Sequence, residues 1–369
     1  MVRYRWIFRI NILVSCCFYK TVYFRRKLRI VDINLFDTIK VVHQYSDVNS
    51  ETIACRRNAA LFDFSFMSSM RISGADSLNI LSRTAKRDFK NMKTGDIRYA
   101  LSYNQSGFVR SDITLWKEGK NEYLLMSGLP DDVNDLLDIE DSQLNYRIED
   151  LRKKINIFSI QGPNSLHKLS HFLNGELLKR LSYFNFMKID VLGTQCLIGR
   201  LGYTGELGFE IVVPSKQSSL LWKHLSSRIT PCGLIAINQL RIEAGFVFYG
   251  NEFRLPVTEK DLGLEQFSNN NAKKQDLRLI CFEGTTNQNL DLWAPTGNLV
   301  LPEVNQIIVT SACKQPGSSK CIGLGFVKIF DEFSCMQSYV DPFESFWDIK
   351  EVPRPFYDTL KELPRTKLY

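Results

Sequence analysis

The sequence predicts an α+β fold, with tandem antiparallel sheets forming a core and a small all-β, barrel-like domain at the C-terminal end. Strand-like alternation and helical periodicity succeed one another between residues 47 and 267. The polar segment 268–276 then interrupts the pattern, and residues 277–369 carry short β-type runs with little helical periodicity. We therefore expect one domain over 47–267 and a second over 277–369, which suits a chain of 369 residues.

The first expected elements are a strand-turn-helix unit and a hairpin. Residues 69–73 alternate as a strand, Gly74 begins a turn, and Ser77 opens a helix with apolar residues three apart. Residues 99–103 and 113–116 then alternate on either side of a turn-forming Asn-Gln-Ser-Gly sequence. These two runs are expected to pair as neighbours in an antiparallel sheet.

Two further strand-turn-helix units follow in the same order. Their strands are expected at 155–160 and 209–213, each ending in residues that break a strand and start a helix. The helix after the first strand has an apolar face made of Leu166, Leu169, Phe172 and Leu173. Another helix is expected over 236–247, and the C-terminal domain has expected strands at 277–282, 306–310 and 322–327.

Residues 1–31 form a basic N-terminal extension that we leave outside the fold. It holds eight Lys and Arg residues and no acid before Asp32. Such a composition is typical of a mitochondrial presequence, although Ser15 is its only serine, and a disordered extension or a wrongly assigned start explains it equally well. Its apolar stretch is shorter than the ~20 residues that span a bilayer. We expect an intracellular protein without a membrane span, cytoplasmic, or mitochondrial if 1–31 is a presequence.

Charge and cysteine usage narrow the class of function. The net charge of +7 arises in the N-terminal extension, because the rest of the chain has 39 basic and 40 acidic residues. Because the chain after the extension has almost no net charge, we do not expect a nucleic-acid partner. Proteins bind nucleic acids mainly by neutralising phosphate groups with basic side chains. Nine cysteines without a Cys-x-x-Cys pair and four histidines predict reduced thiols and no metal site.

Several short motifs then occur in a specific order. They are residues 56–65 (RRNAALFDFS), 95–101 (GDIRYAL), 106–114 (SGFVRSDIT), 160–164 (IQGPN), 201–211 (LGYTGELGFEI), 240–245 (LRIEAG) and 249–252 (YGNE). In this order they resemble the glycine cleavage system aminomethyltransferase (T-protein) family. That folate-dependent family includes the C-terminal folate domains of sarcosine and dimethylglycine dehydrogenases and several tetrahydrofolate-dependent demethylases. The resemblance covers about residues 51–252.

The resemblance implies tetrahydrofolate as the cofactor and two acidic residues as its main partners. A pterin presents a 2-amino group beside a ring N–H, and a fixed carboxylate accepts such a planar donor pair with both oxygens. Glu210 matches the pterin-binding glutamate of the family, and a surface strand residue is the alternative. Asp112 matches the catalytic aspartate, which stabilises positive charge at the accepting nitrogen, and a turn-capping acid is the alternative.

The resemblance also implies that Tyr99, Tyr203 and Gly205 contact the cofactor. Tyr99 resembles a tyrosine that lines the folate channel, and a buried core tyrosine is the alternative. Gly205 permits either a tight turn or a close approach to a flat ligand. Arg241 and Glu243 lie two apart on the expected helix, so they do not face each other and we expect each to make its own fold-stabilising contact.

The sequence departs from the family on the side of the one-carbon donor. Where T-proteins have Ala-Arg-Asp and Asp-x-Ser-His-Met, this chain has Ile237 in place of the arginine and Phe66 in place of the histidine. The N-terminal Trp-x-x-Pro-x-x-Tyr and the later Lys-x-x-Asp-Phe-Ile-Gly elements of the family have no counterpart. Folate binding is therefore predicted more firmly than any one donor.

Two functions remain open. The first is a tetrahydrofolate-dependent aminomethyl or methyl transferase, acting on a small-molecule amine or on a donor held by a carrier such as a lipoyl protein. The second is a non-catalytic folate-binding accessory protein, or a subunit that partners a flavin amine dehydrogenase. The chain has no Gly-x-Gly-x-x-Gly fingerprint, so amine oxidation would require a flavoprotein partner.

Overall fold

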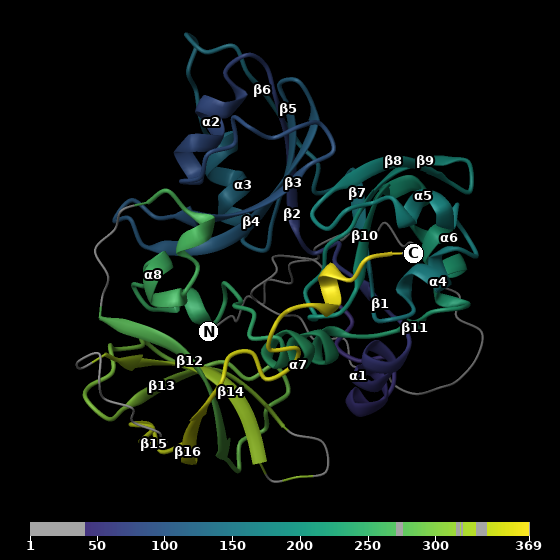
Figure 1. Ribbon diagram of the computed structural model, residues 1–369. Coiled ribbons are helices and arrows are strands. Elements are labelled where there is room, and N and C mark those ends of the chain that lie inside the picture. The colour runs from purple at the N-terminus through teal and green to yellow at the C-terminus, as the bar shows by residue number, and fades with distance from the viewer. Residues whose placement is uncertain (1–40, 271–275, 315–317, 319, 330–337, 369) are drawn as a thin grey trace, which may run out of the picture.

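The computed structural model describes residues 41–270, 276–314, 318, 320–329 and 338–368. The basic extension over 1–31 lies outside the described residues, as does most of the expected linker. Three β-sheets surround the centre of the molecule, and helices cover the outer faces of two of them (Figure 1). The predicted α+β class is confirmed.

The first sheet is antiparallel throughout and has the strand order β3-β4-β5-β2-β6. Its strands are β2 (Ser68–Ser73), β3 (Ile97–Tyr103), β4 (Val109–Gly119), β5 (Glu122–Ser127) and β6 (Arg147–Asp150). The helices α2 (Ser77–Thr84) and α3 (Pro130–Leu137) pack on one face through Ile80, Leu81, Val133 and Leu136. Residues at alternate positions of each strand therefore face the centre of the molecule.

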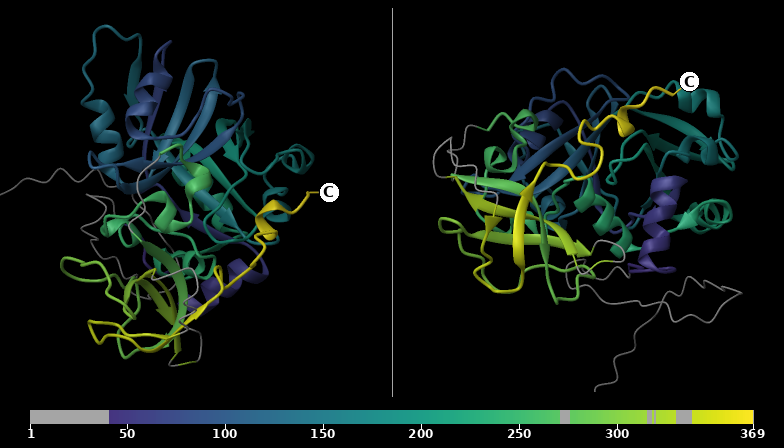
Figure 2. Two further views of the ribbon diagram at one scale, coloured as in Figure 1. Left: turned by 60° about the vertical axis from the view of Figure 1, so that its left-hand side comes forward. Right: turned by 60° about the horizontal axis from the view of Figure 1, so that its bottom comes forward.

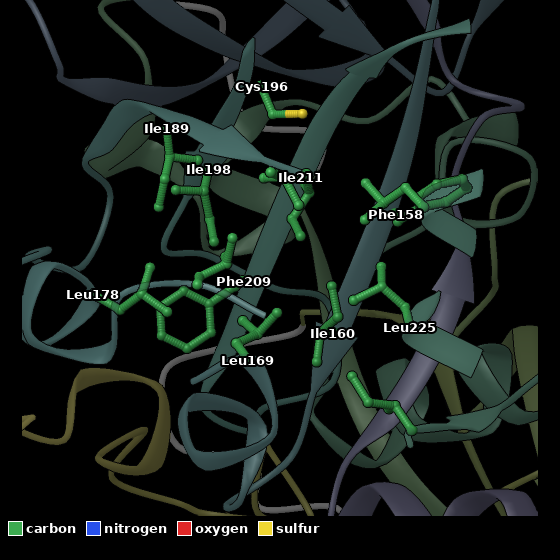
Figure 3. Packing of buried hydrophobic residues seen from close by; sticks show 14 of the residues in the cluster. Phe158, Ile160, Leu169, Leu178, Ile189, Cys196, Ile198, Phe209, Ile211 and Leu225 are labelled. Atoms are coloured by element: carbon green, nitrogen blue, oxygen red, sulfur yellow. The ribbon is translucent and has the colours of Figure 1, made fainter. Parts of the chain in front are cut away.

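The second sheet has the order β11-β1-β7-β10-β9-β8, in which only the β1–β11 pair is parallel. Its strands are β1 (Ala60–Asp63), β7 (Ile155–Gln161), β8 (Phe186–Val191), β9 (Thr194–Gly199), β10 (Gly208–Pro214) and β11 (Thr230–Pro231). Helices α4 (Ser165–Leu169), α5 (Gly175–Lys179) and α6 (Ser215–Ser226) cover its outer face. Side chains from alternate strand positions fill the space beneath these helices (Figure 3).

The third sheet contains the C-terminal strands in the order β13-β14-β12-β16-β15. These are β12 (Leu277–Thr285), β13 (Ile307–Lys314), β14 (Lys320–Lys328), β15 (Ser338–Tyr339) and β16 (Trp347–Val352). The C-terminal region is all-β, as predicted. In the described part of the chain the sheet is not a closed barrel, because its edges meet only at one isolated bridge, Gln306 to Val340.

The remaining elements connect the three sheets. They are α1 (Val48–Arg57), α7 (Leu234–Glu243), α8 (Glu259–Leu262) and the short 3₁₀ helices η1 (Glu252–Arg254), η2 (Glu265–Phe267) and η3 (Leu363–Arg365). Helix α7 packs against α1 on one side and against β13 and β14 on the other. After β16 the chain leaves the third sheet and runs to the second (Figure 2), where Arg200 donates to the main-chain oxygens of Pro364 and Thr366.

Two expected helices differ in extent from the structure. The helix after β7 ends at Leu169, whose main-chain oxygen accepts from Phe172 and Leu173 in the following turn, and Asn174 then caps a separate helix. Helix α7 begins at Leu234 and ends at Glu243, and the chain reverses at Gly245, whose φ of 66° is left-handed.

Candidate functional site

The first and second sheets face each other across a shared apolar core. Its residues come from both sheets and from α7, and they include Ile97, Trp116, Leu124, Met126, Ile157, Phe186, Leu201, Val212 and Ile237. Trp116 on β4 packs directly on Gly199 of β9, where a Cβ atom would collide with the indole ring. This contact fixes which strands lie opposite each other.

Both candidate carboxylates lie on the surfaces that face this core. Asp112 is four residues before Trp116 on β4, so it shares the same face of the first sheet. Glu210 on β10 pairs in register with Gly199, the residue that Trp116 covers. The strands thus bring Asp112 and Glu210 to the same inter-sheet region from opposite sides.

Glu210 is a buried carboxylate with no partner of its own. Its neighbours Phe209 and Ile211 point into the core beneath the helices (Figure 3), which directs Glu210 to the opposite face. Only 6% of Glu210 is exposed, and no hydrogen bond or ion pair reaches its carboxylate from the residues that the structure describes. Burial raises the pKa of Glu210 to about 7. An uncompensated buried carboxylate is costly, so its two oxygens are suited to a ligand that brings donors.

Asp112 is half-buried and accepts one hydrogen bond from a neighbouring tyrosine. Burial raises the pKa of Asp112 to about 6, while the hydroxyl of Tyr99 donates to its carboxylate and opposes the rise. The negative charges of Asp132 and Glu252 add to the increase. No cation pairs with Asp112 within the described ranges. Its pKa therefore lies near the value at which a carboxylate exchanges a proton at neutral pH.

Tyr99 and Tyr203 both lie close enough to Asp112 for its charge to act on them. The Tyr99 ring meets the ring of Phe267 edge-on, with centroids 5.0 Å apart. The Tyr203 ring stacks on Phe246 at 5.8 Å, and its hydroxyl donates to the main-chain oxygen of Val247. Burial raises the pKa of both tyrosines, and the charge of Asp112 raises it further. Both hydroxyls are thus neutral hydrogen-bond donors at physiological pH.

Gly205 has a structural reason to be glycine. Its φ of 80° is left-handed, and a Cβ atom there would lie 3.0 Å from the Cβ atom of Ala244 after α7. The turn and this close packing account for the residue type. Contact between Gly205 and a cofactor stays a prediction.

Gln161 holds the loop that carries Tyr203, a role that its sequence motif did not indicate. Its amide nitrogen donates to Ser159 at 2.9 Å and to the main-chain oxygen of Leu201 at 3.3 Å. Its amide oxygen accepts from Thr204 at 3.0 Å. The side chain fills the space left by Gly202 and Gly208, where Cβ atoms would collide with it. The Gln-Gly-Pro sequence signalled a turn but did not reveal these distant partners.

Arg241 and Glu243 make separate contacts, in line with the expectation from their spacing. Arg241 forms a fully buried ion pair with Glu252 at 2.9 Å and donates to Ser311 of the third sheet at 2.6 Å. Glu243 pairs instead with Arg56 of α1 at 2.6 Å. These contacts join α7 to the third sheet and to α1.

The positions where the sequence departs from the T-protein pattern lie around one small cavity. Ile237, only 4% exposed, and Phe66 line a cavity of about 50 Å³ together with Phe62, Phe64 and Cys232. Its walls are mainly apolar, and no arginine lines it. This cavity adjoins the inter-sheet core, because Ile237, Phe62 and Phe64 belong to both.

Comparison with known proteins assigns the chain to a family. A family model described as the GCVT N-terminal domain matches residues 20–271, which is more than half of the chain. The chain belongs to the GCVT family. The GCVT match includes every candidate site residue and extends beyond the motifs at both ends.

The curated relatives with similar sequences are bacterial proteins named aminomethyltransferase. The protein from Thermosipho melanesiensis is 30% identical over 251 residues, which cover 66% of this chain and 69% of the relative. The one from Pseudothermotoga lettingae is 29% identical over 229 residues, and this chain spans only 62% of its length. In fold, the chain resembles the glycine cleavage system aminomethyltransferase T from Bartonella henselae, with a TM-score of 0.64 at 21% identity, over 78% of this chain and 84% of that one.

Two negative observations apply to the described residues alone. None of their helices is long and apolar enough to cross a membrane. They also contain no cluster of three or more histidine, cysteine or acidic side chains arranged to hold a metal ion.

Proposed function

We propose that this GCVT-family protein is a tetrahydrofolate-dependent transferase that takes an aminomethyl or methyl group from a small amine or from a carrier-bound donor. The observation that carries the proposal is the pair of carboxylates, Asp112 and Glu210, which face one inter-sheet region and have no cationic partner in the described part of the chain. When bound, tetrahydrofolate supplies the nucleophilic nitrogen that accepts the one-carbon unit.

Glu210 fits the pterin end of this cofactor. Its buried, unpartnered carboxylate suits the planar pair formed by the 2-amino group and the adjacent ring N–H. Two charge-assisted hydrogen bonds to these donors would favour the ionised form of Glu210 and offset the cost of burial. The rigid β10 strand fixes the direction of the carboxylate and thus the orientation of the ring.

Asp112 serves the transfer step. Its carboxylate would stabilise the positive charge that develops on a folate nitrogen accepting the one-carbon unit, while the carbon parts from its leaving group, and would accept the proton that this nitrogen loses. The Tyr99 hydroxyl, which donates to Asp112, holds the carboxylate in position.

A second function is favoured by the apolar cavity around Ile237. The lining of this cavity includes Asp63 but no arginine, so it offers no cation to an anionic group of a donor. A folate-binding accessory protein, or a subunit that partners a flavoprotein, needs no such group. Transfer by the purified chain alone supports the enzyme, whereas folate binding without transfer, together with co-purification of a flavoprotein, supports the accessory role.

The test combines binding and turnover in two variants. By calorimetric titration with 5-formyltetrahydrofolate, Glu210→Gln should weaken affinity by roughly 1.5–3 kcal/mol, because charged hydrogen bonds to the pterin are lost. Asp112→Asn should leave this affinity nearly unchanged and abolish transfer from a donor that the wild type uses. Absence of binding by folded wild-type protein would overturn the folate assignment, and unchanged turnover in Asp112→Asn would overturn the role of Asp112.

A further inference from the structure

A second cavity, of about 490 Å³, opens where α1, α7 and the third sheet meet. Helix α7 lies between α1 and the third sheet (Figure 1), and its residues Ile235, Asn238 and Gln239 form part of the cavity wall. Neither Asp112 nor Glu210 lines this cavity. Its volume falls within the range of roughly 300–1,000 Å³ that is usual for small-molecule sites.

The more buried part of the cavity wall is apolar. Leu290 and Cys313, which are 4% and 5% exposed, belong to it. Val48 of α1 and Ile235 of α7 also line the cavity and are half-buried. Removal of aliphatic surface from water favours binding, so this wall suits a ligand with an aliphatic group.

Two carboxamides of α7 keep polar atoms for a ligand. The amide nitrogen of Gln239 donates to Glu243 at 3.0 Å, and the amide oxygen of Asn238 accepts from Arg241 at 3.0 Å. Within the described ranges no hydrogen bond reaches the other amide atom of either residue, although Gln239 is only 8% exposed. The cavity is thus offered an acceptor, the Gln239 oxygen, and a donor, the Asn238 nitrogen.

Two opposite charges lie at the mouth of the cavity. Asp291 and Lys314 both line it, and both are exposed. None of the ion pairs in the described part of the chain includes either residue, so they do not neutralise each other. An acid and a base that share a cavity without pairing suit a ligand that carries both charges itself.

We propose that this cavity binds a free α-amino acid with an aliphatic side chain, such as leucine. The ammonium group of the ligand meets Asp291 and the amide oxygen of Gln239. Its carboxylate meets Lys314 and the amide nitrogen of Asn238, so each charged group finds one opposite charge and one amide partner. The aliphatic side chain lies against the apolar wall. This site is separate from the inter-sheet region and does not rest on the proposed function.

The lining argues against other classes of ligand. A nucleotide or another phosphate ester requires several cations, and Lys314 is the one basic residue among the described residues that line the cavity. A diamine requires a second acid, and Asp291 is the one acid among them. The balance of one positive and one negative charge fits a zwitterion.

The test compares four probes by calorimetric titration of the full chain. They are L-leucine, L-leucinol, which lacks the carboxylate, 4-methylpentanoate, which lacks the amine, and glycine, which lacks the side chain. L-leucine should bind roughly tenfold more tightly than each of the others, because every one of them loses a charged hydrogen bond or the apolar contact. Added salt should weaken L-leucine binding, because exposed charges are screened.

Variants at the mouth of the cavity should remove this discrimination selectively. Lys314→Gln should no longer distinguish L-leucine from L-leucinol, and Asp291→Asn should no longer distinguish it from 4-methylpentanoate. Ile235→Trp should fill the cavity and abolish binding. Asp348→Asn and Lys350→Gln are the matched controls, since both residues are exposed on β16 and do not line the cavity.

Circular dichroism checks that each variant is folded. If Ile235→Trp does not fold, the two variants of exposed residues decide the test. Absence of L-leucine binding by the folded wild type, or equal affinity for all four probes, overturns the proposal. Unchanged discrimination in both Lys314→Gln and Asp291→Asn overturns it as well.

A variant of the inter-sheet region separates this site from the candidate folate site. Glu210→Gln should bind L-leucine like the wild type, because Glu210 does not line the cavity. Loss of L-leucine binding in folded Glu210→Gln would mean that the amino acid occupies the inter-sheet region instead, which overturns the proposed site.

Discussion

Glu210 and Asp112 differ from surface acids because Glu210 is buried and Asp112 half-buried, and the described residues place no cation beside either. Their pKa values of about 7 and about 6 place both near the point of proton exchange at neutral pH. A ligand that donates to Glu210 would favour its ionised form.

Replacing Glu210 should change how stability depends on pH. The folded carboxyl keeps its proton up to pH about 7, whereas the unfolded one releases it near 4.5. The wild type should therefore lose about 3 kcal/mol of unfolding free energy, relative to Glu210→Gln, as the pH rises from about 4.5 to above 7. Urea denaturation at several pH values measures this difference.

The exposed Glu303→Gln provides the control for that experiment. Its stability should follow the wild type at every pH. A constant difference between wild type and Glu210→Gln would mean that the Glu210 carboxyl is not desolvated in the folded protein.

The sequence singled out Asp112, Glu210 and the tyrosines because local motifs carry them, and their roles in a site stay predictions. The sequence did not indicate that Trp116 packs on Gly199, since that contact joins two sheets formed from distant segments. Nor did it separate the roles of the glycines. Gly205 has the left-handed φ of a turn, whereas Gly202 makes room for the Gln161 side chain, and both look alike in a glycine-rich motif.

At the scale of elements, the loop between β9 and β10 depends on one side chain beneath it. Gly202→Ala should destabilise the protein by roughly 1–3 kcal/mol, because the new methyl group collides with Gln161. Adding Gln161→Ala should relieve the collision, so the double variant should lose less than the sum of the two single ones. Chemical denaturation of the four proteins measures the coupling.

Gly119→Ala is the matched control, because a Cβ atom there reaches its nearest neighbour, in Glu122, at an ordinary 3.4 Å. Gly119→Ala should therefore change the unfolding free energy very little. Additive effects of the Gly202 and Gln161 substitutions would show that Gln161 does not support this loop.

Element types were predictable where periodicity was strong, and element ends were not. The hairpin of β3 and β4 and the strands β2, β7 and β10 follow from alternation. The apolar spacing of Leu166 to Leu173 was helical, yet a second helix starts just after it, because the Asn174 side chain accepts from the main-chain nitrogens of Glu176 and Leu177. Strand β16 was missed because it is mostly exposed and polar, which leaves no apolar alternation to read.

At the scale of the whole molecule, the buried pair Arg241–Glu252 links α7 to the third sheet. Glu252 also accepts from Thr310 at 2.8 Å, from Ser311 and from the main-chain nitrogen of Phe248 at 2.7 Å, so its loss would leave a buried cation and these donors without their acceptor. Glu252→Gln should lower the unfolding free energy by about 3–5 kcal/mol. Thermal and urea unfolding measure the change.

Glu351→Gln breaks a comparable pair at the surface, with Arg278, and should cost less than about 1 kcal/mol. Equal costs for the two substitutions would mean that the Arg241 pair does not hold the sheets together.

The C-terminal residues show why whole-molecule arrangement was hardest to predict. The division into 47–267 and 277–369 stays a prediction. After β16 the chain crosses from the third sheet to the second, where Arg200 binds the main chain of Pro364 and Thr366. That segment has proline and polar residues without periodicity, so the sequence assigned it only to the second domain.

The contact between Trp116 and Gly199 makes Trp116 an intrinsic fluorescent probe of the inter-sheet region. An indole enclosed between the two sheets, next to the strand that carries Glu210, is placed to transfer excitation energy to an absorbing ligand in the same region. Tryptophan emission should fall when a reduced folate binds, and Trp116→Phe should remove most of that response. A fluorescence titration therefore reads occupancy of the inter-sheet region directly, without knowledge of the one-carbon donor.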